Sequence, residues 1–283
     1  MVVHVYSAPD KRPMLEESTD MPHSGRITFQ CNICDCVNEI AIDQLKREEP
    51  SCTGCGSTVR MRSIIQILTT ELFGKSLSIS EISPVRPDIK GIGMSCWDGY
   101  ALRLAHRVHF VNTYYHKEPR LDITDIPEDM VGTLDFITST DVFEHVAPPV
   151  SVAFANARRL LKPDGVFVFS VPYGRLRWWE RKTAEHFPNL HDYRIEGTGS
   201  ERVLVNRNRS GEVERFSNLV FHGGEGSTLE MRVFTLASLK TELARAGFTQ
   251  IRIYDKPLLK HGIHWDTRMS VPLAARIKRN FVA

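Results

Sequence analysis

Residues 134–171 carry the strongest structural signal in the chain and read LDFITSTDVFEHVAPPVSVAFANARRLLKPDGVFVFSV. The stretch contains a strand-like run at 134–138, a helical pattern at 149–161, a turn at 163–165 and a nearly continuous apolar run at 166–171. A strand that is apolar on both faces belongs in the middle of a parallel sheet covered by helices. The sequence therefore predicts a strand-helix-strand unit at the centre of an α/β domain.

The alternation of short apolar runs and helical patterns continues on both sides of this unit. Strand-helix-strand alternation at this spacing predicts a doubly wound, mostly parallel sheet in a domain that covers residues 75–283. We expect further strands at 77–82, 108–112 and 249–254, and further helices at 100–107 and 235–246.

Residues 175–227 interrupt this rhythm with many charged side chains and with strand-like pieces at 202–206 and 213–221. We expect an insertion over the carboxyl edge of the sheet, where α/β folds bind ligands. Its basic and aromatic run at 175–182 suits stacking on a sugar or base and pairing with a phosphate; the alternative is an amphipathic lid helix with a solvated basic face. The glycine-rich segment 222–228 lacks the Lys-Ser/Thr of a P-loop, so we expect a hinge or close-approach loop there.

Four cysteines near the N-terminus have the spacing of a metal site. Cys31 and Cys34, followed by Cys52 and Cys55, form the pattern C-x2-C-x17-C-x2-C. Each pair lets two thiolates chelate one ion, and two pairs complete a structural, tetrahedral Zn²⁺ site of the zinc-ribbon-like kind. Cys36 offers an alternative ligand to Cys34. The alternative for the whole group is four buried cysteines or a redox pair.

The cysteine pattern belongs to a small module that we place at residues 29–74, after an irregular arm at residues 1–28. A helix follows the last cysteine of the pattern, capped by Ser57 or Thr58 and ended by Gly74. The arm lacks the long apolar core of a signal peptide, so we expect a cytoplasmic protein. Cysteines stay reduced in the cytoplasm, which favours a metal over disulfides.

The composition is that of an ordinary globular protein, because 42% of the 283 residues are hydrophobic and 25% are charged. The formal net charge of +2 creates no field over the whole molecule that would attract a polyanion or an anionic membrane. No apolar run approaches the roughly 20 residues that span a bilayer. These values argue against a pure nucleic-acid binder and against a membrane protein.

Residues 138–146, TSTDVFEHV, together with residues 159–166, RLLKPDGV, resemble the fourth- and fifth-strand block of class I methyltransferases. In that family, which has a Rossmann-like fold, a D-x-x-E-H segment is followed by L-K-P-G-G before the next strand. The resemblance covers about residues 77–174 and resumes at 228–254. It implies S-adenosylmethionine (SAM) as the cofactor, bound at the carboxyl ends of the strands.

The resemblance assigns cofactor contacts to residues near the expected strand ends. Glu81 would match the acidic end of the first motif, and Gly91 and Gly93 would match the glycine loop, although they lie several residues later than in the family. No acidic residue follows the second strand, where the family binds the ribose, so amide or hydroxyl contacts at Asn112 and Thr113 would substitute. The adenine and the underside of the cofactor are expected to contact Asp122, Ile123, Asp141 and Val142.

These carboxylates also have purely structural interpretations. Glu81 and Asp141 suit helix capping or a solvated strand end, and Asp122 suits a turn. Their order and spacing together favour the cofactor interpretation.

Methyl transfer from a sulfonium is an in-line displacement, and an oxygen or nitrogen nucleophile can require a base. His145 is the leading candidate for this base because the Glu144-His145 pair follows the expected cofactor strand. Its structural alternative is a histidine that caps the following turn. The weaker candidates are His116, His186, His191 and His222.

We therefore expect a SAM-dependent methyltransferase that acts on an oxygen or nitrogen of a small molecule or saccharide. One alternative is an RNA methyltransferase that uses the zinc module to hold nucleic acid. Another is a non-enzymatic binding protein on the same fold. The near-neutral charge and the insertion, which is large enough to enclose a substrate, favour the first hypothesis.

Overall fold

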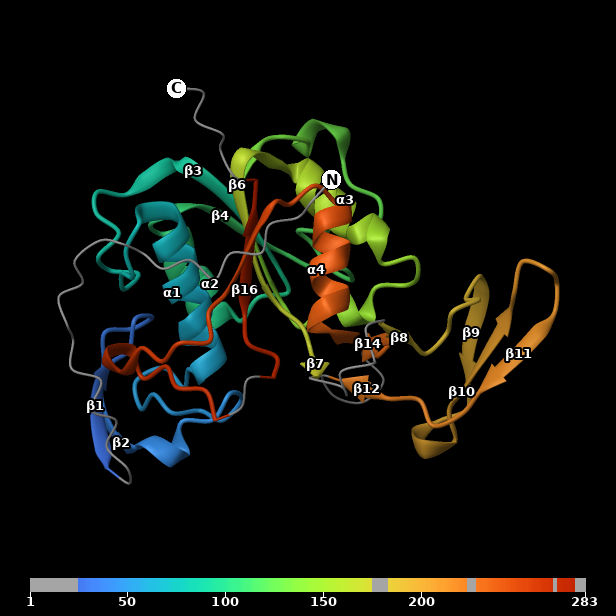
Figure 1. The fold of residues 1–283 in the computed structure, drawn as a ribbon, viewed down its shortest axis with the longest axis horizontal. Helices are drawn as coiled ribbons and strands as arrows, with labels where there is room; N and C mark the ends of the chain where they lie inside the picture. Colours follow the sequence, from blue (N-terminus) through green and yellow to red (C-terminus); the bar gives the residue numbers. More distant parts are fainter. Residues whose placement is uncertain (1–24, 175–182, 223–227, 267–268, 278–283) are drawn as a thin grey trace.

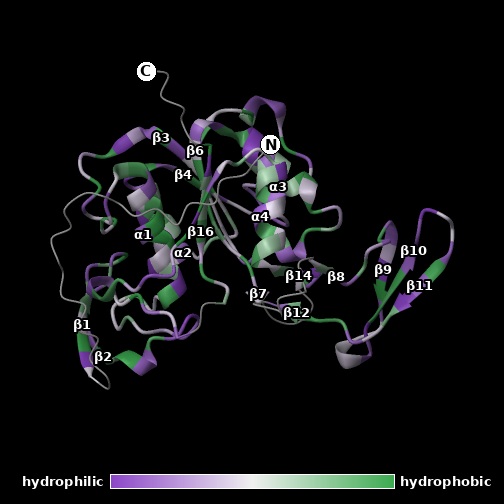
Figure 2. Cartoon of the chain, in the orientation of Figure 1, coloured by the Kyte–Doolittle hydropathy of each residue, from purple (hydrophilic) through white to green (hydrophobic). Residues whose placement is uncertain are grey.

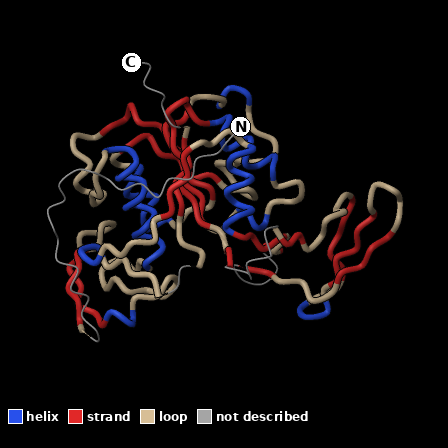
Figure 3. Tube along the Cα trace, in the orientation of Figure 1, coloured by secondary structure: helices blue, strands red, loops and turns tan. Residues whose placement is uncertain are grey.

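The computed structural model describes residues 25–174, 183–222, 228–266 and 269–277. Its centre is a six-stranded sheet with helices on both sides, flanked by a small N-terminal module and by a three-stranded arm that projects away from the body (Figure 1). Figure 3 shows the strands converging between the two groups of helices. Within the described ranges, no helix is long and apolar enough to cross a membrane.

The central sheet has the strand order β15-β16-β6-β5-β3-β4. Its parallel part consists of β4 (Val108–Thr113), β3 (Arg86–Met94), β5 (Leu134–Thr140) and β6 (Leu161–Ser170). β16 (Leu273–Arg276) runs antiparallel between β6 and β15 (Gln250–Ile253), so β15 points in the same direction as β6. The prediction of a doubly wound, mostly parallel sheet is confirmed.

Two helices cover each face of the sheet, and they carry both hydrophobic and hydrophilic residues (Figure 2). The helices are α1 (Val59–Phe73) and α2 (Asp98–Ala105) on one face, and α3 (Ser151–Leu160) and α4 (Leu236–Arg245) on the other. Val166 and Val168 of β6 belong to the first core, whereas Phe167 and Phe169 belong to the second. Successive side chains of a strand point to opposite faces, so a strand between two cores is apolar throughout.

The first strand of the sheet is β3, and the expected strand at 77–82 is not formed. Residues 77–82 make an irregular segment in which Ile79 and Ile82 pack into the core beside the cysteine module. The N–H of Ile79 donates to the carbonyl of Asn32 at 2.9 Å, which fixes the segment to that module. The prediction of a strand at 77–82 was wrong, because apolar residues can also alternate in a loop that is anchored to a core in this way.

Two strands of the sheet escaped prediction. β3 contains Pro87, Gly91 and Gly93, which weaken a strand signal. Packing requires Gly91, because a Cβ there would overlap the ring of Phe136, its partner on β5. β16 escaped because its four residues are too few for a period to be recognised.

The N-terminal module pairs β1 (Arg26–Gln30) with β2 (Val37–Ala41) in an antiparallel hairpin. Residues 26–28 of the predicted irregular arm therefore belong to a strand, while residues 1–24 lie outside the described residues. The predicted helix after the cysteines is confirmed as α1. Thr58 is its N-cap and accepts a hydrogen bond from the N–H of Met61, and Gly74 ends it with a φ of +75°.

The insertion forms three small sheets. The projecting arm consists of β9 (Asp192–Glu196), β10 (Val203–Arg207) and β11 (Val213–Phe216). Nearer the body, the small strands are β7 (Tyr173–Gly174), β8 (Ala184–Glu185), β14 (Arg232–Thr235), β12 (Phe221–His222) and β13 (Thr228–Leu229). β10 and β11 agree with the expected strand-like pieces, although β11 ends earlier. The run 175–182 and the glycines at 223–227 lie outside the described residues.

Short 3-10 helices occur in several loops of the described chain. They are η1 (Ile42–Gln44), η2 (Glu128–Met130), η3 (Phe143–His145), η4 (Gly199–Glu201) and η5 (Leu259–His261).

Candidate active site

A cavity of about 1050 Å³ lies at the carboxyl ends of β3, β4 and β5. Three parts of the chain line it. The strand ends contribute Thr113 and Asp141, the insertion contributes Tyr193 and Phe221, and the N-terminal module contributes Arg60. The cavity occupies the edge of the sheet where α/β folds bind ligands, and residues of the insertion line part of it.

Six of the nine residues expected at the cofactor and catalytic sites line this cavity: Thr113, Asp122, Ile123, Asp141, Val142 and His145. Glu81, Gly91 and Gly93 do not. The carboxylate of Glu81 accepts a hydrogen bond from the N–H of Ser78 at 2.6 Å, in the turn beside the cysteine module. Gly91 and Gly93 lie within β3, where neighbouring aromatic rings fill the space that a side chain would need.

The loop between β3 and α2 takes the place expected for a glycine loop. Ser95 and Trp97 of this loop line the cavity, and Ser95 has a φ of +51°. Asn112 of β4 holds the loop with two hydrogen bonds to the backbone of Cys96, at 2.9 and 2.8 Å. The hydroxyl of Thr113 donates to the carbonyl of Gly93 at 2.8 Å. The amide and hydroxyl that were expected to contact the ribose are therefore engaged in holding the protein together.

Asp122 and Ile123 lie in an ordered turn at the cavity wall. The carboxylate of Asp122 accepts hydrogen bonds from the N–H and the hydroxyl of Thr124, at 2.9 and 2.7 Å, as in the turn interpretation. The side chain of Asn156 on α3 donates to the carbonyl of Ile123 at 2.9 Å. This turn lies in the cavity wall next to the end of β4 because Tyr114, just after β4, bonds with Leu121.

Asp141 is held by two arginines of the N-terminal module. Arg47 contacts both carboxylate oxygens of Asp141 at 3.0 and 3.2 Å, and Nε of Arg60 lies 3.4 Å away. The hydroxyl of Ser170 donates a further hydrogen bond at 2.9 Å. Burial opposes ionisation, but the two guanidinium groups outweigh it and hold the pKa of Asp141 below its usual value. No local pattern identified Arg47 and Arg60, because both precede the motifs at residues 138–146 and 159–166 that carry the resemblance.

The ring of His145 has a defined orientation in the cavity. Its Nδ1 lies 2.9 Å from the carbonyl oxygen of Leu229. A carbonyl can only accept, so Nδ1 carries the proton and Nε2 keeps its lone pair. Burial lowers the pKa of His145, so the ring is neutral at neutral pH. The geometry is that of an available proton acceptor.

Glu144 lies beside His145 and is almost completely buried, with an exposed fraction of 1%. Its Oε1 is 3.6 Å from Nε2 of His145, and its Oε2 has no hydrogen-bond partner among the described residues. Burial, together with the charge of Asp141, raises the pKa of Glu144 to about 8. Glu144 is therefore mostly protonated at neutral pH.

Of the weaker histidine candidates, His116 and His222 line the cavity. Nε2 of His222 and Nε2 of His186 each form a hydrogen bond with one carboxylate oxygen of Glu230, at 2.9 and 3.0 Å. His191 does not line the cavity.

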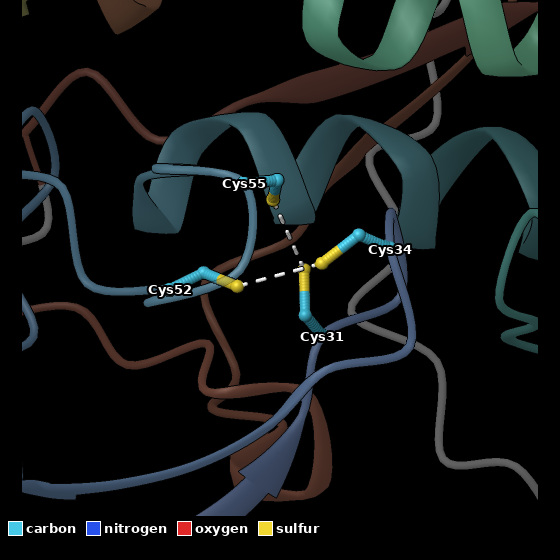
Figure 4. A group of neighbouring side chains, drawn as sticks. All are labelled: Cys31, Cys34, Cys52 and Cys55. Carbon is cyan, nitrogen blue, oxygen red and sulfur yellow. Dashed lines mark hydrogen bonds between the residues drawn. The ribbon is translucent and has the colours of Figure 1, made fainter.

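The four cysteines of the CxxC pairs converge on one point (Figure 4). Their sulfur atoms all lie within 4.8 Å of one another, and the Cys31–Cys55 and Cys34–Cys52 distances are 3.8 and 3.6 Å. A tetrahedral ion with Zn–S bonds of about 2.3 Å separates its sulfurs by about 3.8 Å. Cys36, the alternative to Cys34, is not part of this group.

A buried arginine lies next to the cysteine cluster. Arg62 is fully buried and donates hydrogen bonds to the carbonyls of Ser57 and Gly262, at 2.7 and 2.8 Å. Four thiolates around a divalent ion carry a net charge of −2, which a guanidinium in the same low-dielectric region offsets.

Residues 54–253 match the model of a family described as "Methyltransferase domain", and they make up more than half of the chain. The chain belongs to this family. Its sheet order and cavity are those of a SAM-dependent methyltransferase with a class I, Rossmann-like fold. No curated protein matches the sequence.

Solved structures give weaker similarities. An S-adenosylmethionine-dependent methyltransferase from Clostridium acetobutylicum ATCC 824 is 13% identical with a TM-score of 0.39, over 67% of this chain and 84% of that chain. The sugar N-methyltransferase KedS8 from Streptoalloteichus sp. ATCC 53650 is 14% identical with a TM-score of 0.40, over 71% and 84%. The 1,6-didemethyltoxoflavin-N1-methyltransferase from Burkholderia thailandensis is 18% identical with a TM-score of 0.40, over 77% and 78%.

Proposed function

We propose that the protein transfers a methyl group from SAM to an oxygen or nitrogen of a small molecule or saccharide. The observation that carries this proposal is the cavity of about 1050 Å³ at the strand ends, which residues of the insertion also line. Pockets for small ligands occupy roughly 300–1,000 Å³, so this one has room for a cofactor and a compact substrate together. A substrate held under the insertion would lie against Tyr193 and Phe221.

His145 is the proposed base. When bound, SAM would supply the methyl group of its sulfonium. The rest of the cofactor would then leave as the thioether S-adenosylhomocysteine. The new bond forms between the methyl carbon and the substrate oxygen or nitrogen, and the proton of that atom passes to Nε2 of His145. The Leu229 carbonyl keeps the ring in the tautomer that can accept this proton.

The cofactor would be held by residues that line the cavity at the strand ends. We assign its adenosine part to the corner formed by Thr113, Asp122 and Ile123, and its remainder to the region of Asp141 and Val142. At that corner the carboxylate of Asp98 accepts a hydrogen bond from the hydroxyl of Tyr114 at 3.0 Å. This carboxylate is a further polar group close to where the ribose would lie.

We propose that Cys31, Cys34, Cys52 and Cys55 bind one structural Zn²⁺. The sulfur separations fit a tetrahedral ion, and the four thiolates leave no position open for a catalytic water. We favour a small substrate over RNA as the methyl acceptor. The two arginines of the module, Arg47 and Arg60, lie in the cavity, where they pair with Asp141 and Glu48.

The test is an assay of methyl transfer by the purified, zinc-loaded protein to a panel of phenols, amines and amino sugars. The measured quantity is the rate at which S-adenosylhomocysteine is released. We expect His145→Gln to lower kcat about 10²-fold and to leave the Kd of S-adenosylhomocysteine within about twofold. Because the pKa of His145 is lowered, wild-type activity should fall only on acidification below the ordinary histidine pKa of about 6.5.

His191→Gln is the matched control, because His191 is a histidine of the insertion that does not line the cavity. Its kcat should equal that of the wild type. An unchanged kcat in His145→Gln would remove the base from the mechanism. Methylation of RNA with no turnover of any small molecule would overturn the proposed substrate class.

A further inference from the structure

Two arginines and two carboxylates meet at one end of the cavity. Arg47 and Glu48 come from the loop after η1, Arg60 from the first turn of α1, and Asp141 from the end of β5. Arg60 donates to both carboxylate oxygens of Glu48, at 2.8 and 2.7 Å, and Arg47 pairs with both Glu48 and Asp141. We call these four residues the ion-pair cluster. Three of its four members belong to the N-terminal module.

The ion-pair cluster offers a ligand both positively charged hydrogen-bond donors and negatively charged acceptors. All four residues line the cavity. The polar contacts of Arg60 with Glu48 and Asp141 use Nε and Nη2, and its Nη1 has no hydrogen-bond partner among the described residues. The side chain of Glu48 has an exposed fraction of 49%. With two cations and two anions, the cluster suits a zwitterion better than it suits a simple anion or a simple cation.

The amino-acid end of SAM is such a zwitterion, with one α-carboxylate and one α-ammonium. Guanidinium groups bind carboxylates with paired N–H donors, and carboxylates accept from an ammonium. The sheet order places β3 between β5 and β4, so Asp141 and Thr113 follow strands that lie roughly 10 Å apart. An elongated ligand with its adenosine at the end of β4 therefore extends across β3 toward the ion-pair cluster.

We propose that the ion-pair cluster binds the amino-acid end of SAM. Arg60 and Arg47 hold the α-carboxylate, and Glu48 and Asp141 accept hydrogen bonds from the α-ammonium. This inference rests on the proposed function, and it makes the N-terminal metal module a wall of the cofactor site. The module thereby supplies contacts at the methionine end, where the sequence lacks the usual glycine loop.

A truncated ligand tests the proposal. S-adenosylhomocysteine contains the amino-acid end, whereas 5′-methylthioadenosine has the same adenosine and thioether without it. Both are titrated by calorimetry into zinc-loaded wild type, Arg60→Gln and Arg47→Gln. We expect each variant to raise the Kd of S-adenosylhomocysteine at least about tenfold and to leave the Kd of 5′-methylthioadenosine within about twofold of the wild-type value.

Arg26→Gln is the matched control, since Arg26 belongs to the same module and forms an exposed pair with Glu39 away from the cavity. It should bind both ligands as the wild type does. Glu48→Gln, at a half-exposed position, keeps the size of the side chain and should show the same selective loss if either arginine variant fails to fold. Equal losses for both ligands, or no loss for either, would overturn the proposal while leaving the proposed function intact. A folded wild type that binds neither ligand would overturn the proposed function as well.

Discussion

The carboxyl group of Glu144 gives the cavity a pH-dependent stability. Its pKa of about 8 in the folded protein lies above the ordinary value of 4.5. Between these values the folded protein keeps a proton that the unfolded chain releases. The stabilising contribution is complete below about pH 4.5 and is lost as the pH rises through about 8. We therefore expect the stability of wild type relative to Glu144→Gln to fall across this interval, by on the order of 5 kcal/mol.

Urea unfolding of both proteins between pH 5 and pH 9 measures this difference. Glu128→Gln serves as the control, because the side chain that it replaces is 78% exposed to solvent, whereas Glu144 is buried. A constant difference between wild type and Glu144→Gln across the range would contradict the raised pKa of Glu144.

At the residue scale, the sequence predicted the cavity residues that lie within a recognisable motif. It did not predict the residues that reach the cavity from a distant part of the chain. Asp141 and His145 lie in the D-x-x-E-H segment after a recognisable strand, so their positions could be predicted. Glu81 was misplaced because the strand that should precede it is a loop. Arg47 and Arg60 reach the cavity through the packing of a separate module, and no local pattern encodes that packing.

At the scale of elements, the two residues that pair with Gly91 on the neighbouring strands explain why this position is a glycine. Gly91 on β3 pairs with Phe110 on β4 and with Phe136 on β5. The two rings stack with their centroids 5.7 Å apart, and a Cβ at Gly91 would overlap the ring of Phe136. We expect Gly91→Ala to destabilise the fold by about 1–3 kcal/mol, measured by chemical unfolding.

The smaller side chain in Phe136→Leu provides the control. Added to Gly91→Ala, it should restore part of the lost stability, because it removes the ring that the new methyl group meets. Additive losses in the double variant would show that this contact is not the cause.

Elements with a full period and clear ends could be predicted, and elements without them could not. α1 has a cap, an apolar stripe and a terminal glycine, and β6 is apolar over its whole second half. β3 is built on glycines that its neighbours require, so its own sequence lacks the bulky residues that mark a strand. Such information belongs to the partner strands and becomes visible only in the assembled sheet.

At the scale of the whole molecule, the N-terminal module and one face of the sheet share a single core. Cys31 and Ile33 belong to the same buried cluster as Val166 and Val168. We therefore expect Cys55→Ser to lower the thermal midpoint of the entire protein by at least about 10 °C, in one transition, because loss of Zn²⁺ would loosen that common core. Circular dichroism and measured zinc content test this expectation.

Cys36→Ser is the matched control for zinc loss, since Cys36 lies two residues after Cys34 and outside the sulfur cluster. It should keep one zinc per chain and the wild-type midpoint. A separate early transition in Cys55→Ser, with the main transition unmoved, would mean that the module folds independently.

The place of β16 in the sheet has a consequence for how the chain is made. β16 follows β15 in sequence but lies between β15 and β6, so β15 has no partner in the central sheet until residues 273–276 are available. The carbonyls of Gly262 and Ser270, which bond to Arg62 and Arg47, belong to the same late part of the chain. On the ribosome, the module and the cavity it lines must therefore wait for residues 262–276 to be synthesised before they acquire their final contacts.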